Sequence, residues 1–290
     1  MKKRQKSILA LLLIAALSLM IVACGGKNTD TNISPDNTTN PNPGTETESV
    51  KLVVGATDVP HAEVLEFIKP KLAEQGVELD IRVFNDYVLP NETLAGGELD
   101  ANYFQHKPWL ENYVKETNND IIPFIGVHIE PMGGYSKKIS NISELADDAK
   151  VGVPNAVSEV GRVLALLESN DLIKLKDGVG LAGTLQDITE NPKNLQFVEV
   201  DASLLAPTID EYDFAVINTN FALQAGFVPA EDALIIEGTE SPYVNVLAIR
   251  AESANDAAIK KLADVLLSAD VATFIEQQYD GAVVPAQVEY

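Results

Sequence analysis

Cysteine and positive charge are both scarce in this chain of 290 residues. It has one cysteine, Cys24, and 21 lysine and arginine residues against 43 acidic residues, which gives a formal net charge of −22. A single cysteine excludes a disulfide within the chain. So acidic a surface lacks the basic face that phosphate binding requires, and no nucleic acid partner is therefore expected.

The motifs of several enzyme classes are also missing. The sequence has no G-x-S-x-G nucleophile elbow, and the glycine pair Gly133 and Gly134 lacks the spacing of a phosphate-binding loop. The lone cysteine lies in the N-terminal segment, which argues against a thiol enzyme. No pair of carboxylates stands out among the 43 acidic residues. We predict that the protein is not an enzyme and needs no cofactor.

The first 49 residues differ in composition from the rest of the chain. Residues 1–23 have a basic head and then an uncharged apolar run, which is typical of a secretory signal. A transmembrane anchor is the alternative, but the run is at the short end of the roughly 17 to 25 residues that a spanning helix needs. Residues 24–49 contain a single aliphatic side chain, Ile33, so they predict a flexible tether.

From Val50 onward, short apolar runs alternate with amphipathic segments. Strands are predicted over residues 50–56, 77–85, 121–129, 150–155, 195–200, 214–218, 233–237 and 243–250. Helices are predicted over residues 61–76, 161–170, 256–268 and 271–279. This alternation predicts an α/β fold with mainly parallel sheets, built as one doubly wound sheet or as two lobes. Polar motifs at the ends of the strands favour two lobes, because such loops gather ligands in α/β proteins.

The chain's three histidines raise the question of a metal site. Imidazole binds zinc and manganese, so an extracytoplasmic metal-binding (zinc or manganese) protein is the alternative function. No two of His61, His106 and His128 have the close spacing of a helical metal motif, however. His61 can instead cap a helix, and His128 can be a core histidine bonded to the backbone. No metal ligand is predicted.

Arg162 lies where a predicted strand turns into a helix. Pro154 and Asn155 end the strand, and Ser158 is expected to cap the helix. A helix N-terminus with a guanidinium group one turn inside it suits a carboxylate, because oriented N–H groups and a bidentate charge pair act together. The alternative is a surface arginine paired with one of the many acids, and the local pattern leaves both open.

Polar and aromatic side chains also interrupt or follow buried runs. Asn218 and Asn220 follow an apolar strand, and Asn245 lies inside another apolar run. A buried carboxamide costs free energy unless its donors and acceptors are matched, so Asn245 needs either a backbone partner or a ligand. Tyr87 can belong to the packing or to a pocket wall. The aromatic stretch 101–110 can be core, metal site or ligand pocket.

Seven long stretches in chain order carry a family resemblance. They are GATDVPHAEVLE, DYVLPNETLAGGELDANYFQHKPWL, HIEPMGGYSKK, PNAVSEVGR, QDITENPKNL, DFAVINTNFA and ESPYVNVLAIR. Together with the lipobox-like Ile21-Val22-Ala23-Cys24, they resemble the methionine-binding lipoproteins of ABC importers, the NlpA family. The resemblance runs from about Leu52 to near the C-terminus.

The resemblance implies a periplasmic-binding-protein-like fold, with two α/β lobes joined by crossing strands and the ligand in the cleft. Lobe one is expected to comprise residues 50–134 and 242–290, and lobe two residues 135–241. The signal peptide would be removed and Cys24 acylated, which anchors the protein to the extracytoplasmic face of the cell membrane. The implied partners are methionine, in its L or D form or in a methionyl peptide, and an ABC permease with its ATPase.

The resemblance also implies roles for single residues. Tyr87, Phe104 and His106 match a slot for the methionine side chain, Arg162 matches the partner of the ligand carboxylate, and Asn220 and Asn245 match amides that bind the ligand backbone. Tyr103 and Trp109 are expected in the core, and Asn218 is expected to be structural.

The chain departs from the family pattern just before Arg162. An asparagine and then a charged residue are common there, whereas this chain has Glu159 and Val160. Glu159 can meet a ligand ammonium, repel a carboxylate or point to water. We expect it to point to water.

Overall fold

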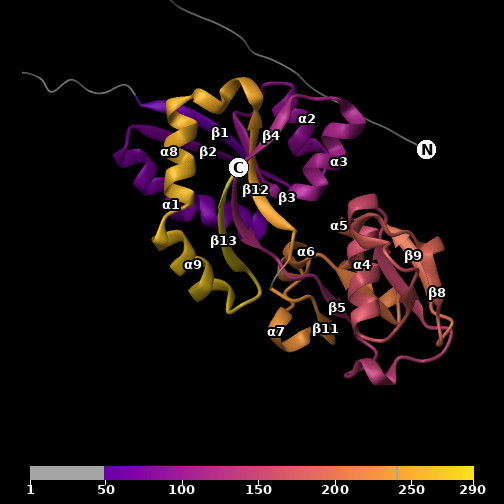
Figure 1. Ribbon diagram of the computed structural model, residues 1–290. Helices are drawn as coiled ribbons and strands as arrows, with labels where there is room; N and C mark the ends of the chain where they lie inside the picture. The colour runs from indigo at the N-terminus through magenta and orange to yellow at the C-terminus, as the bar shows by residue number, and fades with distance from the viewer. Residues whose placement is uncertain (1–48, 240) are drawn as a thin grey trace, which may run out of the picture. The chain divides into compact units, whose positions relative to one another are not determined.

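A computed structural model describes residues 49–239 and 241–290, which form two large β-sheets, each covered by helices on both faces, and one small two-stranded sheet (Figure 1). The predicted signal peptide and Cys24, with all but the last residue of the predicted tether, lie outside these residues. Within the described part of the chain, no helix combines the length and the apolar character needed to cross a bilayer.

The first sheet has six strands. In spatial order they are β13 (Val284–Glu289), β4 (Ile121–Ile129), β12 (Val244–Arg250), β3 (Ala101–His106), β1 (Val50–Thr57) and β2 (Val77–Phe84). The register of its centre brings the ends of three strands together, because Asn245 on β12 lies opposite His106 on β3 and His128 on β4. Three polar residues from distant parts of the sequence therefore lie side by side on neighbouring strands.

Two sets of helices bury the faces of this sheet. On one face lie α1 (Glu63–Glu74), α8 (Ala257–Leu266) and α9 (Ala269–Tyr279), and on the other lie α2 (Leu89–Ala95) and α3 (Lys107–Thr117) (Figure 1). Strand β12 shows the alternation that this arrangement needs, since Leu247 packs in the first cluster while Val246 and Ala248 pack in the second. Its residues are apolar on both faces, as is typical of a central strand.

The second sheet has five strands, in the order β11 (Ile235–Ile236), β5 (Gly133–Tyr135), β10 (Phe214–Ile217), β6 (Lys150–Pro154) and β9 (Gln196–Val200). Helix α4 (Val157–Ser169) covers one face. The short helices α5 (Ala202–Leu205) and α6 (Thr219–Gln224) cover the other. A further short helix, α7 (Pro229–Asp232), and a small hairpin of β7 (Lys174–Leu175) and β8 (Ile188–Glu190) complete the regular structure.

The expectation of mainly parallel sheets is wrong. Strand β12 is antiparallel to both of its neighbours, β13 is antiparallel to β4, and β5 is antiparallel to β10 and β11. The reason is the chain path: β12 follows the second sheet and re-enters the first one, so no helical crossover sets its direction. The alternation of apolar and amphipathic segments correctly predicts the α/β layers, but it does not predict that β12 re-enters the first sheet antiparallel to its neighbours.

The strand and helix predictions from apolar periodicity are confirmed to within a few residues for most elements. Strands β3 and β13 were not predicted, because β3 is rich in polar residues and β13 contains Pro285. The short strands β5, β7 and β8 and the helices α2, α3, α5, α6 and α7 were not predicted either. The predicted cap is also wrong: helix α4 begins at Val157 with Ala156 in the cap position, so Ser158 is already inside the helix.

The chain crosses between the two sheets twice, and the crossings contact each other. The first, residues 130–132, joins β4 to β5, and the second, residues 237–243, joins β11 to β12. The backbone N–H of Glu237 donates to the carbonyl oxygen of Met132 at 2.9 Å, and the Met132 N–H donates to the Glu237 carboxylate at 3.2 Å. These hydrogen bonds hold the crossings side by side.

Gly161 allows helix α4 to approach a neighbouring turn. A Cβ atom at this position would lie 2.2 Å from the carbonyl oxygen of Leu181. Gly161→Ala should therefore lower the free energy of unfolding by about 1 to 3 kcal/mol, although alanine favours a helix interior over glycine by about 1 kcal/mol. Urea unfolding measures this. Gly238→Ala is the matched control, because a Cβ there has no neighbour within 4 Å among the described residues; equal stability of the two variants would contradict the prediction.

Candidate functional site

Twelve side chains from the two lobes line one cavity of about 350 Å³, a volume that includes the part open to solvent. All six residues predicted from the sequence to bind a ligand line it: Tyr87, Phe104, His106, Arg162, Asn220 and Asn245. The other six are Gln105, Trp109, Glu130, Glu159, Asn218 and Thr219. That these six residues line one cavity shows where they lie, and their roles in binding remain predictions.

One wall of the cavity is aromatic. The ring of Tyr87 lies 6.0 Å from that of Phe104 and 5.4 Å from that of Trp109, measured between centroids. The Tyr87 hydroxyl donates to Asn220 Oδ1 at 2.5 Å, which ties this wall to helix α6. Trp109, expected in the core, is half-buried and belongs to the wall. Tyr103 is fully buried, as predicted.

Glu159 is buried in the cavity wall, and the expectation that it points to water is wrong. Only 1% of its surface is exposed, its Oε1 contacts His106 Nε2, and its Oε2 accepts from Asn218 Nδ2 at 2.8 Å. Burial disfavours the Glu159 carboxylate, but the His106 ring and the hydrogen bonds outweigh that effect and lower its pKa to about 2. Glu159 is therefore a buried anion in the neutral pH range.

Arg162 lies in the cavity wall one turn after Glu159 on helix α4, and its guanidinium group joins both crossing segments. Its Nη2 donates to the Glu130 carbonyl oxygen at 2.7 Å, and its Nε and Nη2 reach the Glu237 carboxylate at 2.5 to 3.2 Å. The Tyr243 ring lies 4.3 Å from the guanidinium carbon. The surface-arginine alternative is excluded, because Arg162 is only 4% exposed. Its pairing with an acid, Glu237, was part of that alternative and is observed.

Three buried polar atoms on this cavity have no hydrogen-bond partner among the described residues: Trp109 Nε1, Asn218 Oδ1 and Asn220 Nδ2. A buried donor or acceptor without a partner costs about 1 to 3 kcal/mol. Asn218, which was expected to be structural, donates through its Nδ2 to Glu159, but its Oδ1 has no hydrogen-bond partner among the described residues. Groups of this kind are what a bound polar ligand would satisfy.

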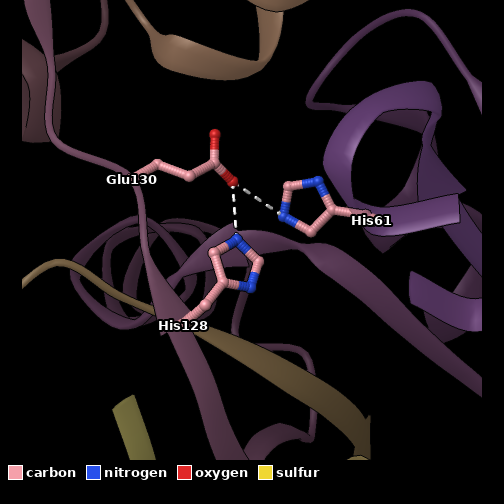
Figure 2. Close-up of side chains that lie close together, drawn as sticks. All are labelled: His61, His128 and Glu130. Atoms are coloured by element: carbon pink, nitrogen blue, oxygen red, sulfur yellow. Dashed lines mark hydrogen bonds and ion pairs between the residues drawn. The ribbon is translucent and has the colours of Figure 1, made fainter. Parts of the chain in front are cut away.

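Behind the cavity, His61, His128 and Glu130 form a buried cluster, with both imidazole rings directed at one carboxylate oxygen (Figure 2). Glu130 Oε1 lies 2.8 Å from His128 Nε2 and 3.2 Å from His61 Nε2. Their Nδ1 atoms contact Tyr103 and Thr57 hydroxyls, and His61 Nε2 is also 3.1 Å from Asn245 Oδ1. The expectations that His61 caps a helix and that His128 bonds the backbone are both wrong.

This cluster is the one group of metal-type ligands among residues 49–239 and 241–290, with its three ligand atoms within 4.8 Å of one another. Two imidazoles and a carboxylate are a donor set that zinc accepts. Every imidazole nitrogen in the cluster already has a hydrogen-bond partner, however. His106 is not part of the group, so the three histidines do not converge as the metal alternative required.

The charge state of the cluster follows from its burial. Burial lowers the pKa of His61 to about 4 and that of His128 to about 3, and it raises the pKa of Glu130. Near pH 7 both rings are therefore neutral. With Glu130 ionised, each Nε2 carries the proton and points it at the carboxylate, while each Nδ1 accepts from a hydroxyl. Neither ring then has an unmatched nitrogen.

Sequence comparison identifies the family. The family described as NlpA lipoprotein matches residues 52–287. The chain belongs to the NlpA lipoprotein family. This confirms the resemblance found in the seven sequence motifs.

Two curated members of the NlpA family are similar to nearly the whole chain. Methionine-binding lipoprotein MetQ of Bacillus subtilis (strain 168) is 40% identical over 286 residues, which cover 97% of this chain and 98% of that protein. D-methionine-binding lipoprotein MetQ of Escherichia coli (strain K12) is 39% identical over 269 residues, covering 92% and 93%. Neither name refers to a metal, so the metal-binding alternative gains no support.

Solved structures of the family share the fold. A nutrient binding protein from Burkholderia cenocepacia bound to methionine is 40% identical, with a TM-score of 0.78 over 81% of this chain and 99% of that one. A putative methionine-binding lipoprotein from Bacillus subtilis is 43% identical, with a TM-score of 0.79 over 81% and 98%. The predicted periplasmic-binding-protein-like fold of two α/β lobes is confirmed.

The sequence did not single out Glu130, Gln105 or Thr219 as residues of the cavity. Glu130 directly follows an apolar strand that was predicted correctly, and this position was the available signal. It went unnoticed because the chain has 43 acidic residues. Gln105 lies between two residues that were named, on a strand that was not predicted.

Proposed function

We propose that this protein captures methionine, or a close analogue of it, and delivers it to an ABC permease and its ATPase without making or breaking a covalent bond. The observation that carries the proposal is the cavity itself, which combines an aromatic wall, a buried guanidinium group and leftover amide groups. The names of the similar proteins agree with this chemistry. The D form and methionyl peptides are included in the proposal.

Each part of methionine has a matching part of the cavity. The thioether suits the predicted slot of Tyr87, Phe104 and His106, which Trp109 extends, because a sulfur atom against an aromatic ring gains roughly 0.3 to 1.5 kcal/mol per contact. The carboxylate suits Arg162, which is buried and charged. Asn220 and Asn245 supply amide groups for the polar end of the ligand. These assignments are the proposed binding roles of the residues.

The proposal includes the location and the division of the chain. Residues 1–23 act as a signal peptide, Cys24 carries the lipid, and residues up to 49 are the tether that holds the protein at the extracytoplasmic face of the membrane. Residues 50–134 and 242–290 form lobe one and residues 135–241 form lobe two. The lipoprotein names of the relatives support the anchor.

Ligand-free protein tests the proposal directly. The protein would be unfolded, dialysed and refolded, then titrated by calorimetry with L-methionine, D-methionine, methionyl dipeptides, leucine and zinc. We expect saturable binding of at least one methionine compound and weaker binding of leucine, which has no sulfur. Binding of zinc in preference to every methionine compound, or no binding at all, would overturn the proposal.

Asn245→Ala is expected to weaken methionine binding about tenfold or more, the equivalent of about 1.4 kcal/mol. Melting of the ligand-free protein should change little, because His61 Nε2, which loses Asn245 Oδ1, keeps Glu130 at 3.2 Å. Calorimetry and thermal melts of the same preparation measure both quantities. A large loss of melting temperature with unchanged affinity would assign Asn245 a structural role instead.

A further inference from the structure

An α-amino acid brings an ammonium group into the cavity together with its carboxylate, and a buried ammonium needs acceptors. Two buried carboxylates line the cavity, those of Glu130 and Glu159. Which of them receives the ammonium follows from where their donors lie and from which polar atoms beside them lack a partner, since an ionised carboxylate accepts at about four sites.

Glu130 is already well supplied with donors. Both histidine rings point at its Oε1, at 2.8 and 3.2 Å, so both lone pairs of this oxygen are in use. In addition, burial raises the pKa of Glu130, which favours its uncharged form. Glu130 is therefore a poor receptor for a cation.

Glu159 has one described donor on each oxygen, from His106 and Asn218. His106 Nδ1 accepts from the Trp109 N–H at 3.1 Å, so the ring turns its Nε2 to Glu159. Each Glu159 oxygen has one described donor and therefore keeps a further lone pair. The cavity wall thus presents an anion with lone pairs to spare.

A second and independent observation lies beside it. Asn218 Oδ1 is a buried acceptor without a partner among the described residues, on a side chain that is 6% exposed. Its orientation is fixed by chemistry, because a carboxylate cannot donate and the Asn218 amide must turn its nitrogen to Glu159. A cation at Glu159 would satisfy this oxygen as well.

The opposite charge is one turn away on the same helix. Glu159 and Arg162 are three residues apart on α4, so both side chains lie on one face and both line the cavity. Asn220 Nδ2, a buried donor with no described partner, suits the carboxylate in the same way as Asn218 Oδ1 suits the ammonium. Helix α4 thus carries the charge pattern that complements a zwitterion.

We propose that Glu159, with Asn218 Oδ1, receives the α-ammonium group of the ligand and makes the cavity selective for compounds with a free amino group. This inference rests on the proposed function, since it assigns a second contact within the same site. It predicts that the amino group contributes to affinity through Glu159 and not through Glu130.

Ligands that lack one charged group test the assignment. Calorimetry would compare L-methionine with 4-(methylsulfanyl)butanoate, which lacks the amino group, on the wild-type protein, Glu159→Gln and Glu130→Gln. We expect the wild type to prefer methionine by about 100-fold, in line with the fold-changes seen when one member of a buried charge pair is removed. In Glu159→Gln this preference should shrink at least about tenfold, mainly through weaker methionine binding.

The ratio between the two ligands separates a binding role from a structural one. Glu159→Gln also disturbs His106 and Asn218, but a purely structural disturbance weakens both ligands alike and leaves the preference unchanged, which would overturn the inference. A preference that collapses in Glu130→Gln instead would also overturn it. If the wild type binds neither ligand, nor any other methionine compound, the proposed function itself fails.

Discussion

Replacing Arg162 with alanine is expected to abolish measurable methionine binding. The ligand carboxylate would enter a buried cavity without its cationic partner, and losing one member of a buried, hydrogen-bonded charge pair costs about 2 to 5 kcal/mol or more. At about 1.4 kcal/mol per tenfold change, this corresponds to a loss of about 30-fold to several thousandfold. Isothermal titration calorimetry measures it, and affinity retained within a few-fold would refute the assignment of Arg162.

The same substitution should also weaken the ligand-free protein, because Arg162 joins the two crossing segments. It bonds the Glu130 carbonyl in one crossing and the Glu237 carboxylate in the other. Removing it leaves Glu237, whose side chain is 18% exposed, without its cation. Breaking a buried pair in this way costs about 3 to 5 kcal/mol, so melting of the ligand-free variant should be recorded in parallel.

Glu237→Gln separates the two effects of Arg162. It removes the negative charge at the crossing but keeps the guanidinium group in the cavity wall. We expect this variant to lose stability and to retain methionine binding. If it loses binding as completely as Arg162→Ala, the loss comes from the arrangement of the crossings and not from the contact with the carboxylate.

Acid is expected to destabilise the protein through the buried histidines. An unfolded histidine takes up a proton near pH 6.5, whereas burial lowers the pKa of His61 to about 4 and that of His128 to about 3. Between pH 6.5 and 4 the unfolded chain binds more protons than the folded one, so stability falls as the pH falls. Over the 2.5 pH units between 6.5 and 4, this corresponds to a loss of about 3 kcal/mol for each histidine.

Other titratable groups around the two histidines also affect how stability depends on pH, so the experiment must separate them from the histidines. Glu130 has a raised pKa and takes up its proton earlier in the folded state, which opposes the loss, while the Tyr103 hydroxyl remains neutral throughout because its pKa is raised. His128→Gln isolates the histidine term, since Glu130 is retained. Stability measured by urea unfolding at several pH values between 7 and 4 should fall less steeply in His128→Gln than in the wild type. Equal slopes would contradict the prediction.

Sequence motifs identified the family and the six candidate ligand residues, because long ordered stretches such as DANYFQHKPWL survive as patterns along the chain. The physical reasoning on single residues went less far. For Arg162 and Asn245 the sequence left two interpretations open, because neither a strand-to-helix turn nor an apolar run identifies the residues that pack against it in space. Only the fold shows that Arg162 is buried and meets Glu237 from a segment 75 residues later.

The metal question illustrates the same limit. His61 and His128 are 67 residues apart, and no spacing rule connects them. The register of β12 against β3 and β4 decides that His106 and His128 flank Asn245, and that His128 joins His61 at Glu130 while His106 goes to Glu159. Strand register depends on the packing of whole sheets, so local sequence does not encode it in a readable form.

By itself, the sequence determined the α/β layering, most of the strands, the longer helices α1, α4, α8 and α9 and the family, because apolar periodicity and ordered motifs are local properties. The tertiary structure decided the antiparallel return of β12, the burial of Glu159 and the meeting of Arg162 with both crossings. These depend on which segments become neighbours in space. The spatial neighbours of a charged side chain determine its role. Glu159 would be an ordinary solvated group on the surface, but beside Arg162 and the unpartnered Asn218 oxygen it is the proposed receptor for the ligand ammonium.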